Sequence, residues 1–100
     1  MAYRQLEKLM NLHDGYRKIV AFQGRQLLLL QENGELHLID RHCPHAGQVL
    51  DQAKVEGELL TCPKHLMQFS TRDGRPSGGA CGGLGVYKLA YEGNSVGIEE

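Results

Sequence analysis

The sequence predicts an all-β domain, built as an antiparallel sandwich or barrel of short strands. Turn-forming pairs such as Asp14-Gly15, Asn33-Gly34 and Asp73-Gly74 punctuate the chain, at intervals of roughly ten residues, which is typical of such folds. The segments between the turns are short, and they either alternate apolar with polar residues or are rich in leucine. With 100 residues, the chain is expected to form one domain over residues 1–100.

The N-terminal segment departs from this strand pattern. Leu6, Leu9, Met10 and Leu12 recur at helical spacing, so a short turn of helix is expected over residues 4–12. We interpret this turn as a structural cap on the barrel, with a helix that docks a partner as the alternative.

The first half of the chain is then expected to form consecutive strands. Asn33-Gly34 is the clearest hairpin signal, because an Asn-Gly pair favours the two-residue turn of a β-hairpin. The leucine run before this pair suits a well-buried strand, and the segment after it alternates along Leu36, His37, Leu38 and Ile39. The expected strands lie at residues 18–23, 25–31 and 35–40.

The second half carries weaker strand signals around two short loops. A strand at residues 58–61 should lead into the second loop, and residues 66–70 should return from it. Residues 85–91 and 95–99, joined at residues 92–94, make a closing hairpin.

The two loops carry the chemistry of the chain. Each of the stretches Cys43-Pro44-His45 and Cys62-Pro63-Lys64-His65 offers one thiolate and one imidazole, and sixteen residues separate His45 from Cys62. Two thiolates and two imidazoles can complete a tetrahedral zinc site or a two-iron cluster with bridging sulfides. Zinc-finger spacing usually groups two cysteines together and two histidines together. The mixed loops therefore favour the iron cluster, with zinc as the alternative.

This pair of loops resembles the iron–sulfur signature of the Rieske family, and Phe69 stands where Rieske ferredoxins often carry an aromatic residue. The resemblance covers roughly the whole chain. It implies a Rieske-type fold whose tip consists of two cluster-binding loops, at about residues 42–48 and 62–69. It also implies a [2Fe–2S] cofactor, with histidines on the solvent side of the cluster. The implied cofactor-binding and metal ligands are Cys43, His45, Cys62 and His65.

Two departures from high-potential Rieske proteins point to a low-potential member. High-potential proteins typically join their two loops by a disulfide, but Gln48 and Lys64 occupy those places here. They also carry a serine after the second histidine, whereas Leu66-Met67 offers no hydroxyl. The expected potential is near the lower end of the roughly −150 to +300 mV span of Rieske centres.

The resemblance to ferredoxins of multicomponent ring-hydroxylating dioxygenases implies a soluble one-electron carrier. Its donor would be a flavin-containing reductase, its acceptor a terminal oxygenase, and each encounter would be transient. No Ser/His/Asp constellation or phosphate loop can be placed in the sequence, so the chain is expected to be an electron-transfer component and not an enzyme. The alternatives are a Rieske-like small subunit of a larger oxidoreductase, such as a nitrite reductase or arsenite oxidase, and a structural zinc-binding interaction domain.

Composition restricts the partners and the compartment. The net charge is −1 with mixed signs and no basic stripe, which argues against nucleic acid as a partner. The longest apolar run, residues 27–30, is too short to span a bilayer, and the N-terminus lacks the apolar stretch of a secretory signal. The protein is expected to be a cytoplasmic monomer that does not associate with a membrane.

The remaining histidines and the third cysteine are interpreted as structural residues and not as cluster ligands. His13 is expected in a solvated turn, His37 at the surface of its strand, and His42 in local loop packing beside Cys43. Cys81 is interpreted as a buried packing thiol. It lies in a glycine-rich stretch, residues 76–83, which is placed to form the third loop that covers one side of the cluster in the family.

Overall fold

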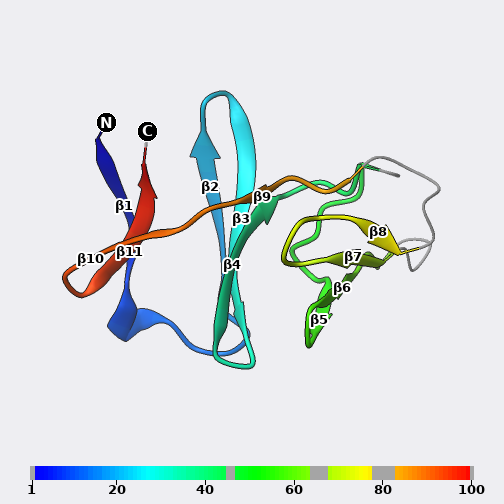
Figure 1. Ribbon diagram of the computed structural model, residues 1–100, viewed down its shortest axis with the longest axis horizontal. Helices are drawn as coiled ribbons and strands as arrows, with labels where there is room; N and C mark the ends of the chain where they lie inside the picture. Colours follow the sequence, from blue (N-terminus) through cyan, green and yellow to red (C-terminus); the bar gives the residue numbers. More distant parts are fainter. Residues whose placement is uncertain (1, 45–46, 64–67, 78–82, 100) are drawn as a thin grey trace.

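The computed structural model describes residues 2–44, 47–63, 68–77 and 83–99, and its architecture is the predicted all-β one (Figure 1). In this described part of the chain, the strands form three antiparallel sheets. Within the same residues, no helix is long and apolar enough to cross a membrane.

The central sheet confirms the expected strands of the first half. It consists of β2 (Arg17–Phe22), β3 (Arg25–Glu32), β4 (Glu35–Asp40) and β9 (Val86–Tyr87), in that order. Asn33 and Gly34 join β3 to β4 with positive φ angles of 53° and 76°. These angles are those required by a type I′ hairpin turn, so this turn is confirmed.

Strand β3 separates two hydrophobic cores. Its leucines at positions 27 to 30 are fully buried, with 0% exposure each. Because neighbouring side chains in a strand point to opposite faces, Leu28 and Leu30 pack in one core and Leu27 and Leu29 in the other. Each buried leucine contributes roughly 1.5–3 kcal/mol, which makes β3 the centre of the fold.

The N-terminal prediction was wrong in its main part. Residues 4–12 do not form a helical turn throughout, because β1 (Tyr3–Lys8) is a strand and only Leu9–Asn11 form a 3₁₀ turn, η1. Strand β1 pairs antiparallel with β11 (Ser95–Glu99), which also pairs with β10 (Ala90–Glu92). The backbone bonds to β11 replace those that a helix would make internally.

The expected closing hairpin is also modified. Residues 85–91 do not form one strand, because β9 pairs with β4 of the central sheet while β10 pairs with β11. Lys88 and Leu89 lie between these two short strands. The chain therefore crosses from one sheet to another at this point, as the long orange segment in Figure 1 shows.

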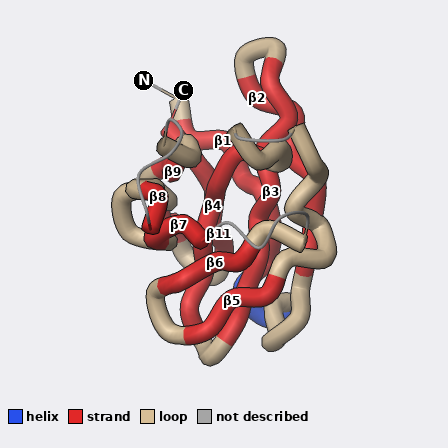
Figure 2. The backbone as a smooth tube through the Cα atoms, turned by 90° about the vertical axis from the view of Figure 1, so that its right-hand side faces the viewer, coloured by secondary structure: helices blue, strands red, loops and turns tan. Residues whose placement is uncertain are grey.

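The third sheet forms one end of the molecule. It contains β5 (Lys54–Glu56), β6 (Leu59–Thr61), β7 (Gln68–Ser70) and β8 (Pro76–Ser77) in sequential order. Figure 2 faces this end, with β5 to β7 in front. Strands β6 and β7 fall within the predicted segments 58–61 and 66–70, and the loop between them carries the second predicted motif.

Candidate metal centre

The two predicted cysteine ligands are brought into one buried cluster. Cys43 follows β4 and is 1% exposed, and Cys62 follows β6 and is 0% exposed. Both belong to the core on the Leu28 and Leu30 side of β3. Two sequence-distant thiols therefore share one apolar environment, in which a thiolate needs a metal or another positive charge to compensate its burial.

The first loop is a tightly bonded hairpin. The Cys43 amide donates to the Gln48 carbonyl at 2.8 Å, and the Gly47 amide donates to the Cys43 carbonyl at 2.8 Å. Below these bonds, the Leu50 amide donates to the Arg41 carbonyl at 2.7 Å. Gly47 has a φ of 67°, a left-handed conformation that glycine adopts without a steric penalty. The backbone thus fixes the position of Cys43.

The second loop is held between two strands. Thr61 of β6 pairs with Gln68 of β7, and the Gln68 side-chain amide lies 3.4 Å from the Thr61 hydroxyl. Phe69, which the sequence associates with this loop, is 0% exposed and packs in the same core as both cysteines. Pro63, directly after Cys62, is exposed, so the chain runs from the core to the surface at this point.

The predicted histidine ligands, His45 and His65, lie outside the described residues, as do Leu66, Met67 and Cys81. Within the described part of the chain, no group of three or more His, Cys, Asp or Glu side chains could hold a metal. Two buried thiols in an apolar core fit the thiolate half of an iron–sulfur site, because iron in such clusters takes soft sulfur ligands. The four-residue ligand set stays a prediction.

The remaining histidines have different surroundings. His13 is exposed, with its Nδ1 2.9 Å from the Asp14 carbonyl oxygen, and His42 is exposed in the first loop. His37 is not at the surface as predicted, since it is half-buried and its buried Nε2 has no hydrogen-bond partner among the residues that the structure describes. Burial lowers the pKa of His37. The expectation was wrong because both faces of the central sheet are covered by cores.

Sequence reasoning missed two polar networks at the start of the first loop. Arg41 pairs with Asp51 across the loop, and Asp40 bonds to Tyr87 and to the backbone of Gly85. A surface hollow of about 310 Å³ lies beside these residues. It is lined by Arg25, Gln26, Asp40 and His42. The only signal in the sequence was that Asp40 and Arg41 lie three and two residues before Cys43.

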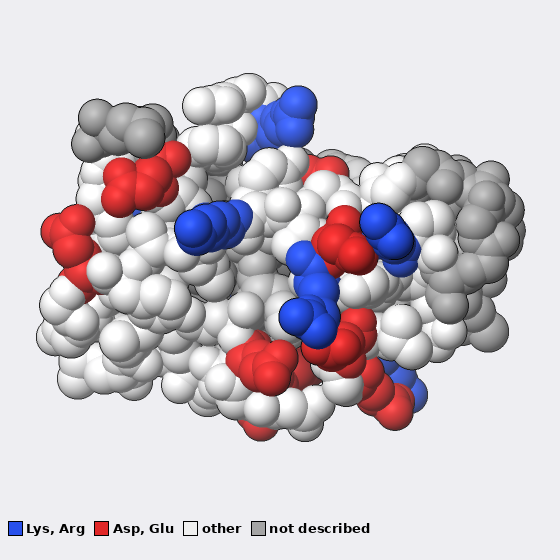
Figure 3. All heavy atoms as spheres, in the orientation of Figure 1, with Lys and Arg blue, Asp and Glu red and all other residues white. Residues whose placement is uncertain are grey.

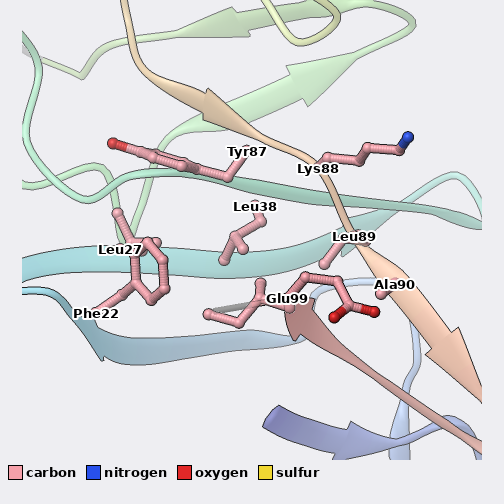
Figure 4. A pocket seen from close by; sticks show the side chains of 9 residues that line it. Phe22, Leu27, Leu38, Tyr87, Lys88, Leu89, Ala90 and Glu99 are labelled. Carbon is pink, nitrogen blue, oxygen red and sulfur yellow. The ribbon is translucent and has the colours of Figure 1, made fainter. Parts of the chain in front are cut away.

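An apolar hollow of about 290 Å³ lies between the central sheet and the sheet formed by β1, β11 and β10. Leu27, Leu38 and Leu89 line it, and the Lys88 side chain extends away from them (Figure 4). Neither Cys43 nor Cys62 contributes to its wall. On the face seen in Figure 3, acidic and basic side chains are interspersed, in agreement with the net charge of −1.

The fold and the site together define a small all-β domain, in which each of two loops brings a buried cysteine to one core. A family model of the Rieske [2Fe-2S] domain matches residues 4–84, and the chain belongs to this family. A Rieske-type [2Fe–2S] cluster is accordingly its cofactor. Such a cluster exchanges single electrons.

Two curated relatives match this chain over very different shares of their own length. The ferredoxin component of a naphthalene 1,2-dioxygenase system from Pseudomonas aeruginosa is 30% identical over 56 residues, which are 56% of this chain and 54% of that protein. A cholesterol 7-desaturase from Xenopus laevis is 33% identical over 75 residues, which are 73% of this chain and 16% of that protein. The chain thus spans about half the length of the first relative and a much smaller share of the second.

Solved structures share the fold at low sequence identity. A Sphingomonas yanoikuyae B1 ferredoxin superposes with a TM-score of 0.82 at 22% identity, over 99% of both chains. A protein assigned as an NADH-dependent nitrite reductase small subunit from Mycobacterium tuberculosis gives 0.80 at 17% identity, over 96% of this chain and 91% of that one. A chain in a complex of oxygenase and ferredoxin in carbazole 1,9a-dioxygenase gives 0.77 at 20% identity, over 93% and 97%.

Proposed function

We propose that this protein is a one-electron carrier, whose Rieske cluster receives an electron from a flavin-containing reductase and delivers it to a terminal oxygenase. The observation that carries the proposal is the burial of Cys43 and Cys62 in one core, in a chain of the Rieske family. A cluster with four protein ligands has no open coordination position for a substrate. The protein therefore transfers electrons and does not itself catalyse a reaction.

The proposed ligands are Cys43 and Cys62 on one iron and His45 and His65 on the other. Deep burial of both described cysteines supports the first half of this assignment, since their loops are anchored by the Cys43–Gln48 bond and by the β6–β7 pair. With two ferric ions, two sulfides and two thiolates, the oxidised centre is formally neutral. Its reduction is therefore easier than that of a cluster with four thiolates, which sets the Rieske potential above that of such ferredoxins.

An oxygenase is the proposed acceptor because a curated relative is the ferredoxin component of a dioxygenase system. The likeness to a ferredoxin that was solved with its oxygenase adds support at the level of the fold. The exposed Pro44 and Pro63 beside the two cysteines provide surface at the cluster end. A reductase as donor follows from the resemblance of the two motifs to those of ring-hydroxylating systems.

The testing experiment is an EPR spectrum of the purified protein before and after anaerobic reduction with dithionite, with iron, sulfide and zinc analysis of the same sample. We expect a silent oxidised form that gives a rhombic Rieske signal on reduction. The variants Cys43→Ser, His45→Ala, Cys62→Ser and His65→Ala should each lose this signal, and His42→Ala should keep it. A colourless protein that contains zinc and no iron would overturn the proposal.

A nitrite reductase small subunit is the second candidate, favoured by the superposition on the Mycobacterium tuberculosis protein over most of both chains. The two functions differ in how the partner is held. A carrier meets its partners through small, weak interfaces, whereas a subunit remains with its large chain during purification. Affinity purification of the tagged protein from its native host separates them, since a stoichiometric large subunit would support the second function.

A further inference from the structure

The chain that follows residue 83 is fixed by an unusually close backbone contact. The Leu84 amide donates to the Gly74 carbonyl at 2.8 Å. A Cβ added at Gly74 would lie 1.7 Å from the Leu84 carbonyl oxygen, and Gly74 has a φ of 77°. Only glycine fits this place, both for space and for backbone conformation. Leu84 is therefore held against the turn that connects β7 to β8.

The next residue is fixed by a second polar contact, which we name the Asp40 latch. The latch consists of Asp40, Gly85, Tyr87 and Arg25. The Gly85 amide donates to Asp40 Oδ2 at 3.0 Å, and the Tyr87 hydroxyl donates to Asp40 Oδ1 at 2.6 Å. Arg25 Nη1 in turn donates to the Tyr87 hydroxyl at 3.0 Å.

The latch also depends on a glycine. A Cβ at Gly85 would lie 2.4 Å from Asp40 Oδ2 and 2.9 Å from the Tyr87 hydroxyl. The backbone bond from the Asp40 amide to the Gly85 carbonyl, at 2.9 Å, completes the contact. The end of β4, which leads to Cys43, is thus tied to residue 85.

Leu84 lies between these two anchors, and its side chain is part of the metal-site core. It is 3% exposed and belongs to the same buried cluster as Cys43 and Cys62. Two close contacts on consecutive residues therefore place one apolar side chain in the core that holds both thiols.

We propose that Leu84 sets the reduction potential by excluding water from the cysteine side of the cluster, and that the Asp40 latch positions it there. The inference rests on the proposed ligand set. Reduction adds one negative charge to a formally neutral centre, and an environment of low polarity disfavours that charge. The apolar shell around a metal controls its access to solvent and hence its potential. Leu84 accordingly lowers the potential.

The test compares the reduction potentials of matched variants by dye-mediated titration, with the EPR signal as proof that the cluster is present. Leu84→Ala should favour the reduced state about threefold, which is about 28 mV for a one-electron couple. Leu29→Ala removes the same atoms from the opposite core and should leave the potential unchanged, although both variants lose stability. Leu84→Met, which keeps the apolar volume, should remain at the wild-type potential.

A second pair of variants tests the latch in a protein with an intact core. Tyr87→Phe removes the hydroxyl bond to Asp40, and with it the Arg25 bond to that hydroxyl, without a change in charge. It should raise the potential, as Leu84→Ala does. Tyr16→Phe removes an equivalent bond from a tyrosine to a carboxylate, that of Glu7, and should not.

The outcomes separate this inference from the proposed function. Equal potentials in Leu84→Ala and Leu29→Ala would overturn the inference. The inference would also be overturned if Leu84→Ala failed to bind a cluster and Tyr87→Phe kept the wild-type potential. A wild-type protein without any Rieske signal would instead overturn the proposed function.

Discussion

Arg41 and Asp51 form a two-point ion pair across the base of the first loop. Arg41 Nε lies 3.1 Å from Asp51 Oδ1, and Nη2 lies 3.1 Å from Oδ2. The third nitrogen, Nη1, donates to Gln26 Oε1 at 3.0 Å. The side chains of the pair are 21% and 26% exposed, so solvent screens the pair less than one on the open surface. The guanidinium thus joins the first loop to the central sheet.

We predict that Arg41→Lys loosens this loop, because an ammonium cannot reproduce the planar two-point contact. We expect a lower midpoint of urea denaturation, together with a severalfold shorter half-life of the cluster. Urea denaturation and the decay of the visible absorbance measure the two effects.

Arg72→Lys is the matched control. Arg72 makes a 3.4 Å ion pair with Glu58, with side chains 74% and 61% exposed, and such pairs contribute little. Equal cluster half-lives in the two variants would show that the Arg41 contact does not stabilise the metal site.

Gly97 gives a prediction for the N-terminal strand. A Cβ at Gly97 would lie 2.0 Å from the Arg4 carbonyl oxygen and 3.0 Å from Gln5 Cα. Gly97→Ala should therefore push β1 away from β11 and cost about 3 kcal/mol in the free energy of unfolding. Gly93→Ala is the control, since Gly93 has a φ of 58° but no atom of the described residues lies within 4 Å of the added Cβ. It should cost about 1 kcal/mol, from backbone strain alone, and an equal cost at both positions would contradict the close β1–β11 contact.

The contrast between two segments shows what local sequence can predict. The Asn33-Gly34 hairpin was predictable because the turn and both of its strands are contiguous, and the backbone angles of these two residues carry the signal themselves. Strand β1 was not predictable, because its partner β11 lies at the other end of the chain. The helical spacing of the N-terminal leucines was misleading, since Met10 is 79% exposed and Leu9 is 38% exposed.

The candidate site divides in the same way. The spacing of the two motifs predicts Cys43 and Cys62 as ligands, and the structure buries both side chains in one core. The Asp40–Tyr87 bond spans 47 positions in the sequence, and neither residue type points to the other. His37 was expected at the surface because a strand of alternating residues usually has one solvent-exposed face. That reasoning fails where a second core covers the other face.

His37 supports a prediction about stability and pH. Its buried Nε2 has no hydrogen-bond partner in the described part of the chain, so His37→Leu should be neutral or stabilising by about 1 kcal/mol at neutral pH. Burial lowers its folded pKa below the ordinary value of 6.5, so the unfolded state binds the proton more readily. The wild type should therefore lose stability as the pH falls below 6.5, and His37→Leu should lose less. Urea titrations at several pH values measure this difference, with His13→Leu as an exposed control, and parallel pH profiles for wild type and His37→Leu would contradict it.

The hydrogen bonds of Glu7 lead to a second prediction about how stability depends on pH, at more acidic values. The Tyr16 hydroxyl donates to Glu7 Oε2 at 2.5 Å, and the Asn11 side chain and the Lys8 amide donate to Oε1 at 3.0 and 2.8 Å. These bonds, that of Tyr16 first, lower the pKa of Glu7 from 4.5 to about 2. The contribution of the carboxylate to stability is then fully present above pH 4.5 and is lost as the pH falls towards 2.

Glu7→Gln should remove that dependence, because an amide does not titrate, and Tyr16→Phe should reduce it by removing the strongest bond. The measurement is the melting temperature of each variant relative to wild type across the interval from pH 4.5 to about 2. Taking the difference cancels the titration of all other groups, the acid sensitivity of the cluster included. Glu56→Gln removes the same charge from an exposed position on β5 and should run parallel to wild type. If Glu7→Gln also runs parallel, the hydrogen bonds to Glu7 do not stabilise its ionised form, and the junction between β1 and β2 must be held by apolar packing around Leu6 and Val20.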